Sequence, residues 1–373
     1  MMDIHVIYIA GTLLISMVCG LISIPLIINF CYKHNIFDMP TARKVHKRGI
    51  PRLGGVCFLP SMLAAILAVV PMLNSHSETG NEVTISLWSC MFFLSLALIY
   101  STGLTDDIVG LGPKTKLGVQ ILAASFLPLS GLYINNLYGL FGIHEIPYWI
   151  GFAITVFMIV FIDNAMNLID GIDGLCGGVA LIALSGFLYC FMCSGMLVYS
   201  MLIAAMMGVL CSFLYFNVFG TVENKRKIFM GDSGSLTIGF ILGFLWVKFC
   251  MSTPKEMPFR DDSIVISFSL IIVPLLDVVR VSLVRLMHGK PIFSADKNHI
   301  HHKMLRTGMT QHQALAAILT MCITFIAVNM LLITVVSATV IAITDIVLWV
   351  AIQQIINIFI RRKGKSVFNP IEQ

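Results

Sequence analysis

The sequence has few charged residues. Of its 373 residues only 12% are charged, whereas 58% are hydrophobic and the mean hydropathy is +0.91. Soluble domains carry about 25% charged residues, so these charges are too few to cover a water-exposed surface of this size. Much of the surface must therefore face lipid, which excludes the ordinary soluble globular proteins.

The sequence also lacks signs of internal division. We find no Gly-, Ser- or Pro-rich linker, no low-complexity run and no convincing internal repeat, although such features commonly mark the boundaries of domains. We therefore predict a single membrane domain over residues 1–373. The net charge of +5 is too small to indicate a nucleic-acid partner.

Long apolar stretches recur along the whole chain. The first has Pro25 within it and lacks the basic start and cleavage pattern of a signal peptide, so we expect a retained helix. Because a transmembrane helix needs about 20 mainly apolar residues, we predict an all-α polytopic protein with about 11 transmembrane helices. The stretches are 4–30, 53–73, 85–104, 117–134, 147–166, 174–194, 197–216, 233–251, 263–286, 313–334 and 336–360.

The basic residues are unevenly distributed over the loops. If the N-terminus lies outside, 21 of the 24 Lys and Arg fall on the cytosolic side, and only Lys248, Lys255 and Arg260 fall on the other. Basic residues favour cytosolic loops. The sequence therefore predicts an outside N-terminus and a cytosolic C-terminus.

Four blocks of polar residues lie at helix ends that this orientation places in the cytosol. Polar groups at membrane depth are costly, so each block suggests function until a structural role is found. The first is the pair Asp106 and Asp107, which repel each other unless a cation or proton intervenes; the alternative is a solvated helix end. In the second, Asn167, Asp170 and Asp173 recur every third residue, near one face of a helical turn.

Glycines accompany the second block, and a further acid opens the third. Gly171 and Gly174 would break or kink the segment and let a ligand approach the backbone. The third block, 229–235, has Asp232 at the start of the eighth helix. Capping is its simplest interpretation, but the free amides and the helix dipole there also attract phosphate.

The fourth block, 293–302, contains His299, His301 and His302. Their spacing fits no common zinc pattern, and in a loop rich in Lys and Arg we interpret them as donors to phosphate. Nearby, Asp277 has Arg280 three residues on, which indicates an intrahelical ion pair and not a catalytic group.

The four blocks together combine hard oxygen ligands suited to Mg²⁺ or Mn²⁺ with Lys, Arg and His donors. This is the set that transfer at phosphorus requires. The sequence has no Walker-type glycine loop, G-x-S-x-G elbow or H-E-x-x-H helix.

In order and interval, the blocks resemble the polyprenyl-phosphate N-acetylhexosamine-1-phosphate transferases over roughly residues 33–306. Arg43 and His46, followed by the run 51–55, add a fifth match. Ile300 interrupts the histidines, which resembles the WecA/TagO-like branch and not the peptidoglycan branch with its three consecutive His. Members of the WecA/TagO-like branch use UDP-N-acetylglucosamine to start O-antigen, enterobacterial common antigen or teichoic acid synthesis.

The resemblance implies roles for individual residues, with Mg²⁺ (or Mn²⁺) as cofactor. Lys116 would contact the pyrophosphate, and Asp106 and Asp107 would act as base, orient the acceptor or lie near the metal. The predicted catalytic residues are Asp106, Asp107 and Asp170; the predicted metal ligands are Asp232 and Asn167; the predicted substrate-binding residues are Arg43, His46, Lys116, Asn167, Asp173, Asn217, His299, His301 and His302. We expect Asp107, Asn167 and Asp232 to meet around one divalent ion.

The implied reaction transfers N-acetylglucosamine-1-phosphate from UDP-N-acetylglucosamine to a polyprenyl phosphate, with release of UMP, at the cytosolic face of the bacterial inner membrane. One alternative keeps this chemistry with another UDP-N-acetylhexosamine or UDP-N-acetylmuramoyl-pentapeptide. Another is a transporter or flippase, but transporters place ionisable groups near the bilayer midplane in paired halves, and no such halves are visible. The oligomeric state, including a homodimer, is left open.

Overall fold

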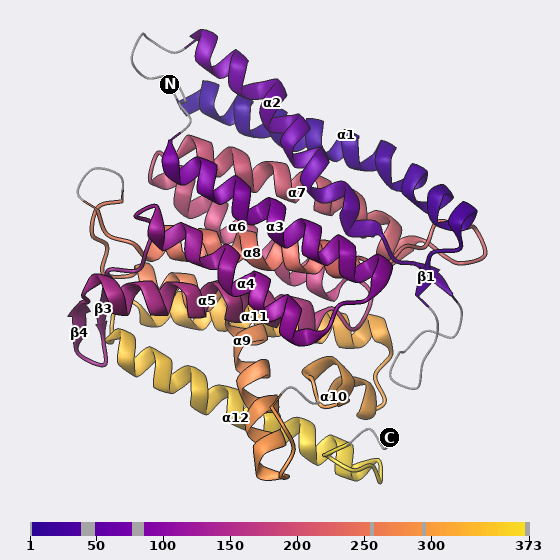
Figure 1. The fold of residues 1–373 in the computed structure, drawn as a ribbon. Helices are drawn as coiled ribbons and strands as arrows, with labels where there is room; N and C mark the ends of the chain where they lie inside the picture. The colour runs from indigo at the N-terminus through magenta and orange to yellow at the C-terminus, as the bar shows by residue number, and fades with distance from the viewer. Residues whose placement is uncertain (1, 39–48, 77–85, 254–256, 293–295, 370–373) are drawn as a thin grey trace. The chain divides into compact units, whose positions relative to one another are not determined.

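A computed structural model of the chain describes residues 2–38, 49–76, 86–253, 257–292 and 296–369 (Figure 1). Within these ranges the regular structure is almost entirely helical, with two short antiparallel strand pairs. The helices are α1 (Met2–His34), the 3₁₀ helix η1 (Gly54–Cys57), α2 (Phe58–His76), α3 (Leu87–Val109), α4 (Pro113–Leu129), α5 (Tyr148–Ile169), α6 (Leu175–Cys193), α7 (Leu197–Phe219), α8 (Asp232–Cys250), α9 (Ser263–Met287), α10 (Ile300–Arg306), α11 (Gln311–Leu332) and α12 (Ala338–Arg362). The strands are β1 (Phe37–Asp38), β2 (Ile50–Pro51), β3 (Asn136–Leu140) and β4 (Ile143–Glu145).

Ten helices within the described residues are long and apolar enough to cross a membrane, so the predicted all-α polytopic fold is confirmed. The prediction also named the stretch 117–134, which forms only α4, a helix of 17 residues that includes Lys114 and Lys116. A helix of this length spans about 26 Å, less than the roughly 30 Å of a hydrocarbon core. The predicted orientation of the termini is not tested by the fold.

The helices group into two compact units. The first consists of residues 1–39, 48–131 and 180–242, and the second of residues 40–47, 132–179 and 243–373. Helices α6 and α8 each contribute residues to both units. The single domain over residues 1–373 stays a prediction.

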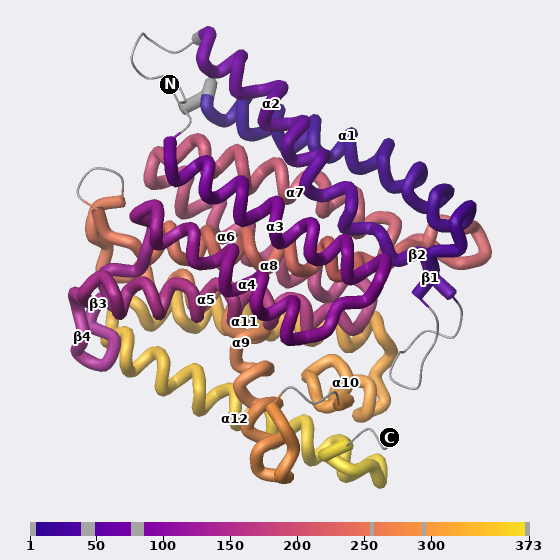
Figure 2. The backbone as a smooth tube through the Cα atoms, in the orientation of Figure 1, coloured from indigo at the N-terminus to yellow at the C-terminus, as the bar shows by residue number. Residues whose placement is uncertain are grey.

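In the first unit, α1 packs along α7 (Figure 2). Ser16 Oγ donates to the carbonyl of Ala205 at 2.6 Å, and Ser212 Oγ donates to the carbonyl of Met17 at 2.7 Å. Because lipid offers little hydrophobic driving force between helices, close packing and such interhelical hydrogen bonds hold the pair together.

In the second unit, α9 contacts α5, α11 and α12. Asn329 on α11 donates from Nδ2 to Ser269 Oγ on α9 at 2.8 Å and to Asp345 Oδ2 on α12 at 3.0 Å. All three side chains are buried, where water competes little with hydrogen bonds. These contacts fix the first half of α9, whose second half carries several polar residues of the candidate site.

Candidate active site

The first and third predicted blocks meet in the first unit, at the end of α3 and the start of α8. The buried carboxylate of Asp107 accepts the backbone N–H of Asp232 at 2.9 Å and that of Ser233 at 3.0 Å. The first N–H groups of a helix have no partner within the helix, so Asp107 caps α8. The capping role that the sequence suggested for Asp232 thus belongs to Asp107.

Lys116 from α4 lies between two of the predicted carboxylates. Its Nζ is 2.6 Å from Asp232 Oδ2 and 3.2 Å from Asp106 Oδ2. Burial disfavours the charged amine, but the carboxylates of Asp232 and Asp106 outweigh this effect and raise the pKa of Lys116 above its ordinary value. We call Asp106, Asp107, Lys116 and Asp232 the acidic cluster.

Glycine lets the backbone approach the acidic cluster closely. Gly231 has a φ of +73°, and a Cβ there would lie 2.5 Å from Asp107 Oδ2, so only glycine fits. Two residues before it, Phe229 donates its N–H to the carbonyl of Pro51 at 2.7 Å. The carbonyl of Phe229 accepts the N–H of Gly54 at 2.9 Å. The run 51–55, the fifth match in the sequence, therefore supports the segment that leads into Asp232.

Asn217 supports the same segment from the end of α7. Its buried side chain donates from Nδ2 to the carbonyl of Ile228 at 2.8 Å, and its own carbonyl accepts a hydrogen bond from Lys227 Nζ. Asn217 therefore helps to fix the loop before α8. Its contact with the nucleotide stays a prediction.

The second block lies in the second unit, where α5 ends one residue before Asp170. Asn167 lies on the last turn of α5, whereas Asp170 and Asp173 lie in the turn between α5 and α6. The expectation that all three share one face of a helical turn is wrong, because the chain leaves the helix at Asp170. The predicted break at Gly171 and Gly174 is confirmed, and the φ of +77° at Gly174 is one that favours glycine.

The fourth block packs against this turn. A Cβ on Gly171 would lie 2.1 Å from His301 Nε2, so the imidazole of His301 occupies the space that a side chain would need. The His299 and His301 rings are nearly parallel, with centroids 6.1 Å apart, and the centroid of His302 is 4.2 Å from that of His301. We call residues 296–302 the histidine loop.

Two of these histidines are neutral near pH 7. Burial, followed by the nearby imidazoles of His302 and His299, lowers the pKa of His301 well below its ordinary value. Burial, followed by the nearby imidazole of His299, lowers the pKa of His302 to about 4. A neutral imidazole still has one N–H to donate, and within the described residues His301 Nδ1 has no hydrogen-bond partner.

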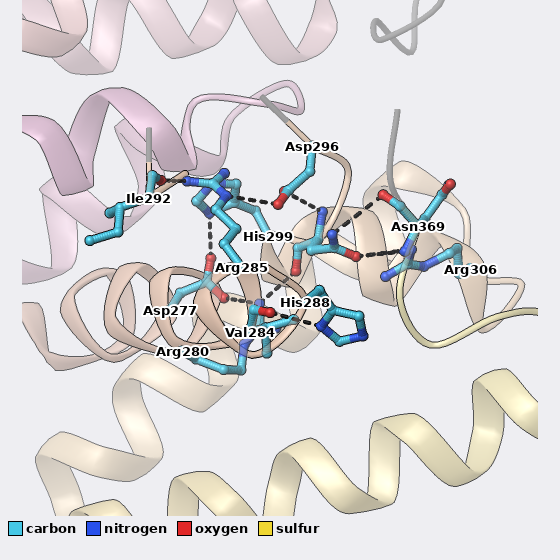
Figure 3. Close-up of polar contacts among 11 residues, drawn as sticks. Asp277, Arg280, Val284, Arg285, His288, Ile292, Asp296, His299, Arg306 and Asn369 are labelled. Carbon is cyan, nitrogen blue, oxygen red and sulfur yellow. Dashed lines mark hydrogen bonds and ion pairs between the residues drawn. The ribbon is translucent and has the colours of Figure 1, made fainter. Parts of the chain in front are cut away.

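Asp277 anchors the histidine loop to α9 (Figure 3). The predicted ion pair with Arg280 is present at 2.6 Å. Asp277 also accepts a hydrogen bond from His299 Nδ1 at 2.9 Å and, on both oxygens, the backbone N–H of Ile300 at 3.1 Å. The sequence does not predict these contacts, because a turn separates Asp277 from His299 and Ile300 and no helical spacing relates them.

Arg285, two turns further along α9, holds the start of the loop. It donates from Nε to Asp296 Oδ2 at 2.8 Å and from Nη1 to the carbonyl of Ile292 at 2.6 Å (Figure 3). Burial disfavours the ionised acid, but Arg285 outweighs it and lowers the pKa of Asp296. The carboxylate of Asp277 and the guanidinium of Arg285 therefore both tie the loop to α9.

The end of the described chain covers the other side of the loop. Asn298 accepts the backbone N–H of Asn369 at 3.0 Å and donates to the carbonyl of the same residue at 3.3 Å. The ring of Phe368 stacks on His288, with centroids 3.9 Å apart. The segment after α12 thus helps to position the histidine loop.

Several buried donors around the loop have no hydrogen-bond partner within the described part of the chain. They are Arg280 Nε, Arg306 Nε and Arg306 Nη2. An unpaired buried donor costs about 1–3 kcal/mol, so this concentration of them favours a ligand that is rich in acceptor oxygens. Arg43 and His46, the remaining predicted residues, lie outside the described residues.

Comparison with known proteins gives the class of the chain. Residues 89–250 match the family described as "Glycosyl transferase family 4". The match contains both carboxylates of the first block, the second block and Asp232. This part of the chain is therefore similar to glycosyl transferase family 4, and the chain is a multi-pass membrane transferase.

Individual relatives are similar over most of the chain. A protein of Bacillus subtilis (strain 168) named "Probable undecaprenyl-phosphate N-acetylglucosaminyl 1-phosphate transferase" is 28% identical over 327 residues, covering 85% of this chain and 83% of the relative. Proteins of Yersinia pestis and Escherichia coli (strain K12), named "Undecaprenyl-phosphate alpha-N-acetylglucosaminyl 1-phosphate transferase", are each 28% identical over 290 residues. In both cases the matched residues cover 77% of this chain. They cover 74% of the Yersinia protein and 73% of the Escherichia protein.

Proposed function

We propose that this chain transfers N-acetylglucosamine-1-phosphate from UDP-N-acetylglucosamine to undecaprenyl phosphate in the bacterial inner membrane, with release of UMP. The names of the relatives support this activity. The observation that carries the proposal is the acidic cluster, in which Lys116 lies between two carboxylates at the N-terminus of α8. A helix N-terminus with a lysine beside it is suited to phosphate oxygens.

The acidic cluster also fits Mg²⁺. Asp106 and Asp232 both direct a carboxylate oxygen at one ammonium group, so a cation is already favoured between them. Mg²⁺ commonly takes one or two carboxylates and completes its shell with substrate phosphates and water. We assign Asp232 and Asp106 as its ligands in the first unit; the role of Asn167 as a ligand stays a prediction.

In the proposed reaction an oxygen of the lipid phosphate attacks the β-phosphorus of UDP-N-acetylglucosamine. A new P–O bond forms there, the bond from this phosphorus to the bridging oxygen breaks, and UMP leaves with that oxygen. Bound Mg²⁺ would neutralise charge on the diphosphate. The second pKa of a phosphate monoester is near 6, so the acceptor is mostly dianionic near pH 7 and needs no strong base.

The carboxylates of the acidic cluster then have different tasks. Both oxygens of Asp107 accept backbone N–H groups of α8, so we infer that Asp107 positions Asp232 and takes no proton. Lys116 would orient the diphosphate. The unpaired donors at the histidine loop would bind phosphate or sugar oxygens, and a cytosolic orientation would let soluble UDP-sugar reach them while the lipid tail stays in the bilayer.

The test is a reaction of purified protein with undecaprenyl phosphate and a panel of UDP-N-acetylhexosamines, with and without Mg²⁺. We expect UMP and a lipid-linked pyrophosphoryl sugar with UDP-N-acetylglucosamine, and neither product after chelation of the metal. Activity only with UDP-N-acetylmuramoyl-pentapeptide or another sugar would replace the proposed donor. Absence of UMP with every donor would refute the proposed reaction.

A further inference from the structure

Asp277 is a buried carboxylate that the proposed reaction leaves without a task. Its exposure is 1%. Its described partners are the donors Arg280 Nη2 and His299 Nδ1 (Figure 3) and the backbone N–H of Ile300. A carboxylate that accepts from a guanidinium and an amide has no proton to give. The hydrogen in the contact with His299 is therefore assigned to the imidazole Nδ1.

This contact determines which nitrogen His299 offers to a ligand. With Nδ1 donating to Asp277, only Nε2 remains, because the bond made by one ring nitrogen sets the role of the other. Nε2 of His299 is buried and has no hydrogen-bond partner among the described residues. Its ring lies parallel to that of His301, which packs on Gly171 in the turn that carries Asp170.

Arg280 extends the same restraint to the loop backbone. Its Nη2 donates to Asp277 at 2.6 Å and also to the carbonyl of Asn298 at 2.6 Å. The residue before His299 and the residue after it are thus both fixed to α9, the latter through the N–H of Ile300. A ring held at Nδ1 and on both sides of its backbone has little freedom to turn.

We propose that Asp277 is the positioning residue of the histidine loop, which fixes the tautomer and the orientation of His299 so that Nε2 meets the UDP-sugar. This inference rests on the proposed function for the identity of the ligand. Asp277 itself touches no substrate; it acts through His299. The ion pair with Arg280 keeps the carboxylate ionised for this task.

A double-mutant cycle separates positioning from a general structural role. Asp277→Asn should lower kcat/KM for UDP-N-acetylglucosamine by about 10- to 100-fold, the usual loss when the partner that orients a functional histidine is changed. His299→Gln should cost a similar factor, and the double variant should be no worse than His299→Gln alone, because a residue that acts through another loses its effect once the other is gone.

The matched control is Asp345→Asn, which changes another buried carboxylate of the second unit, one that contacts Asn329. We expect its kcat/KM to stay within about twofold of the unchanged protein, as for sites without shared partners. Independent, multiplying effects of Asp277→Asn and His299→Gln would overturn the inference. So would an Asp277→Asn variant with unchanged kcat/KM.

A second measurement needs no turnover. In protein labelled with ¹⁵N-histidine, the signals of His299 are identified by their loss in His299→Gln. Asp277→Asn should shift them and Asp345→Asn should not; unshifted signals in Asp277→Asn would contradict the inference whatever the donor. Failure of the unchanged protein to release UMP would instead refute the proposed function and leave this spectroscopic result standing.

Discussion

The acidic cluster and the histidine loop consist of different kinds of side chains. The acidic cluster sets three carboxylates against one ammonium, and its oxygens are engaged by Lys116 and by the backbone of α8. The histidine loop is surrounded by guanidinium and imidazole groups, several of which have unpaired donors within the described residues. One region is rich in carboxylates and the other in guanidinium and imidazole groups.

The two regions also differ in how they are held. Asp107 caps α8 from 125 residues away, and Lys116 contacts Asp232 from 116 residues away, so each side chain of the acidic cluster has few partners and these come from distant helices. The histidine loop is tied to α9 and to the segment after α12 at several points. A single change should therefore damage the acidic cluster more than the histidine loop.

The largest effect should follow from Asp232→Asn. This change removes the charge that we assign to Mg²⁺ and leaves Lys116 with only Asp106. We expect UMP release to fall on the order of a thousandfold or more, as for loss of a group that stabilises charge in a transition state. Near-normal activity in purified variant protein would refute the metal assignment and reduce the acidic cluster to a structural feature.

Asp107→Asn should lower both activity and stability. An amide keeps one acceptor oxygen, so one backbone N–H of α8 loses its partner at a cost of about 1–3 kcal/mol. We expect a lower Tm and a loss of activity smaller than that of Asp232→Asn. Asp106→Asn is the control, because it should raise the Mg²⁺ concentration needed for half-maximal rate and leave Tm nearly unchanged; equal Tm losses would contradict the division of tasks.

A milder effect should follow from Asn298→Ala, which removes both hydrogen bonds to the backbone of Asn369 and a longer one from Arg306 Nη1 at 3.5 Å. Loss of two contacts worth about 0.5–1.5 kcal/mol each should raise KM for UDP-N-acetylglucosamine by about 3- to 10-fold. Asn369→Ala keeps the backbone atoms that make these contacts and should leave KM unchanged. If both variants behave alike, the chain after α12 does not position the loop.

The smallest effect should appear in the pH dependence of stability. Buried Lys303 on α10 donates to Gln353 at 2.6 Å, and burial, followed by the positive charge of Arg280, lowers its pKa from 10.5 to about 7. The unfolded chain then binds more protons than the folded chain between about pH 7 and 10.5, so this lysine makes stability rise with pH over that window.

Lys303→Met removes this contribution. Its Tm relative to the unchanged protein should be most favourable near pH 6, where the folded lysine is charged, and least favourable near pH 9.5. Thermal unfolding in detergent at both values measures the difference, and Lys365→Met serves as the control because Lys365 is exposed and lies after the end of α12. A Tm difference that does not depend on pH would contradict the lowered pKa.

Much of the fold follows from the sequence, because a membrane helix depends on local composition. Ten of the predicted apolar stretches recur as candidate spans within the described residues. The stretch 117–134 differs because Lys114 and Lys116 belong to the helix that it forms, which ends at Leu129. An apolar run indicates which segment can lie in lipid, but it does not give the first and last residues of the helix.

The candidate site is less accessible to sequence analysis, because its contacts are long-range. The residue types and glycine breaks could be predicted, but not that Asp107 caps α8 or that Asp277 contacts His299, 22 residues away. The spacing of Asn167, Asp170 and Asp173 suggested a shared helical face, although the chain leaves the helix before the second of them. Periodicity in a sequence predicts the faces of one helix or strand. It does not predict which side chains of two different elements will be in contact.

The contact between Gly171 and His301 has an evolutionary consequence. No side chain at position 171 can coexist with the present place of that imidazole, so two motifs 130 residues apart are not free to diverge independently. A side chain at position 171 would become possible only together with a smaller residue, or a displaced ring, at position 301.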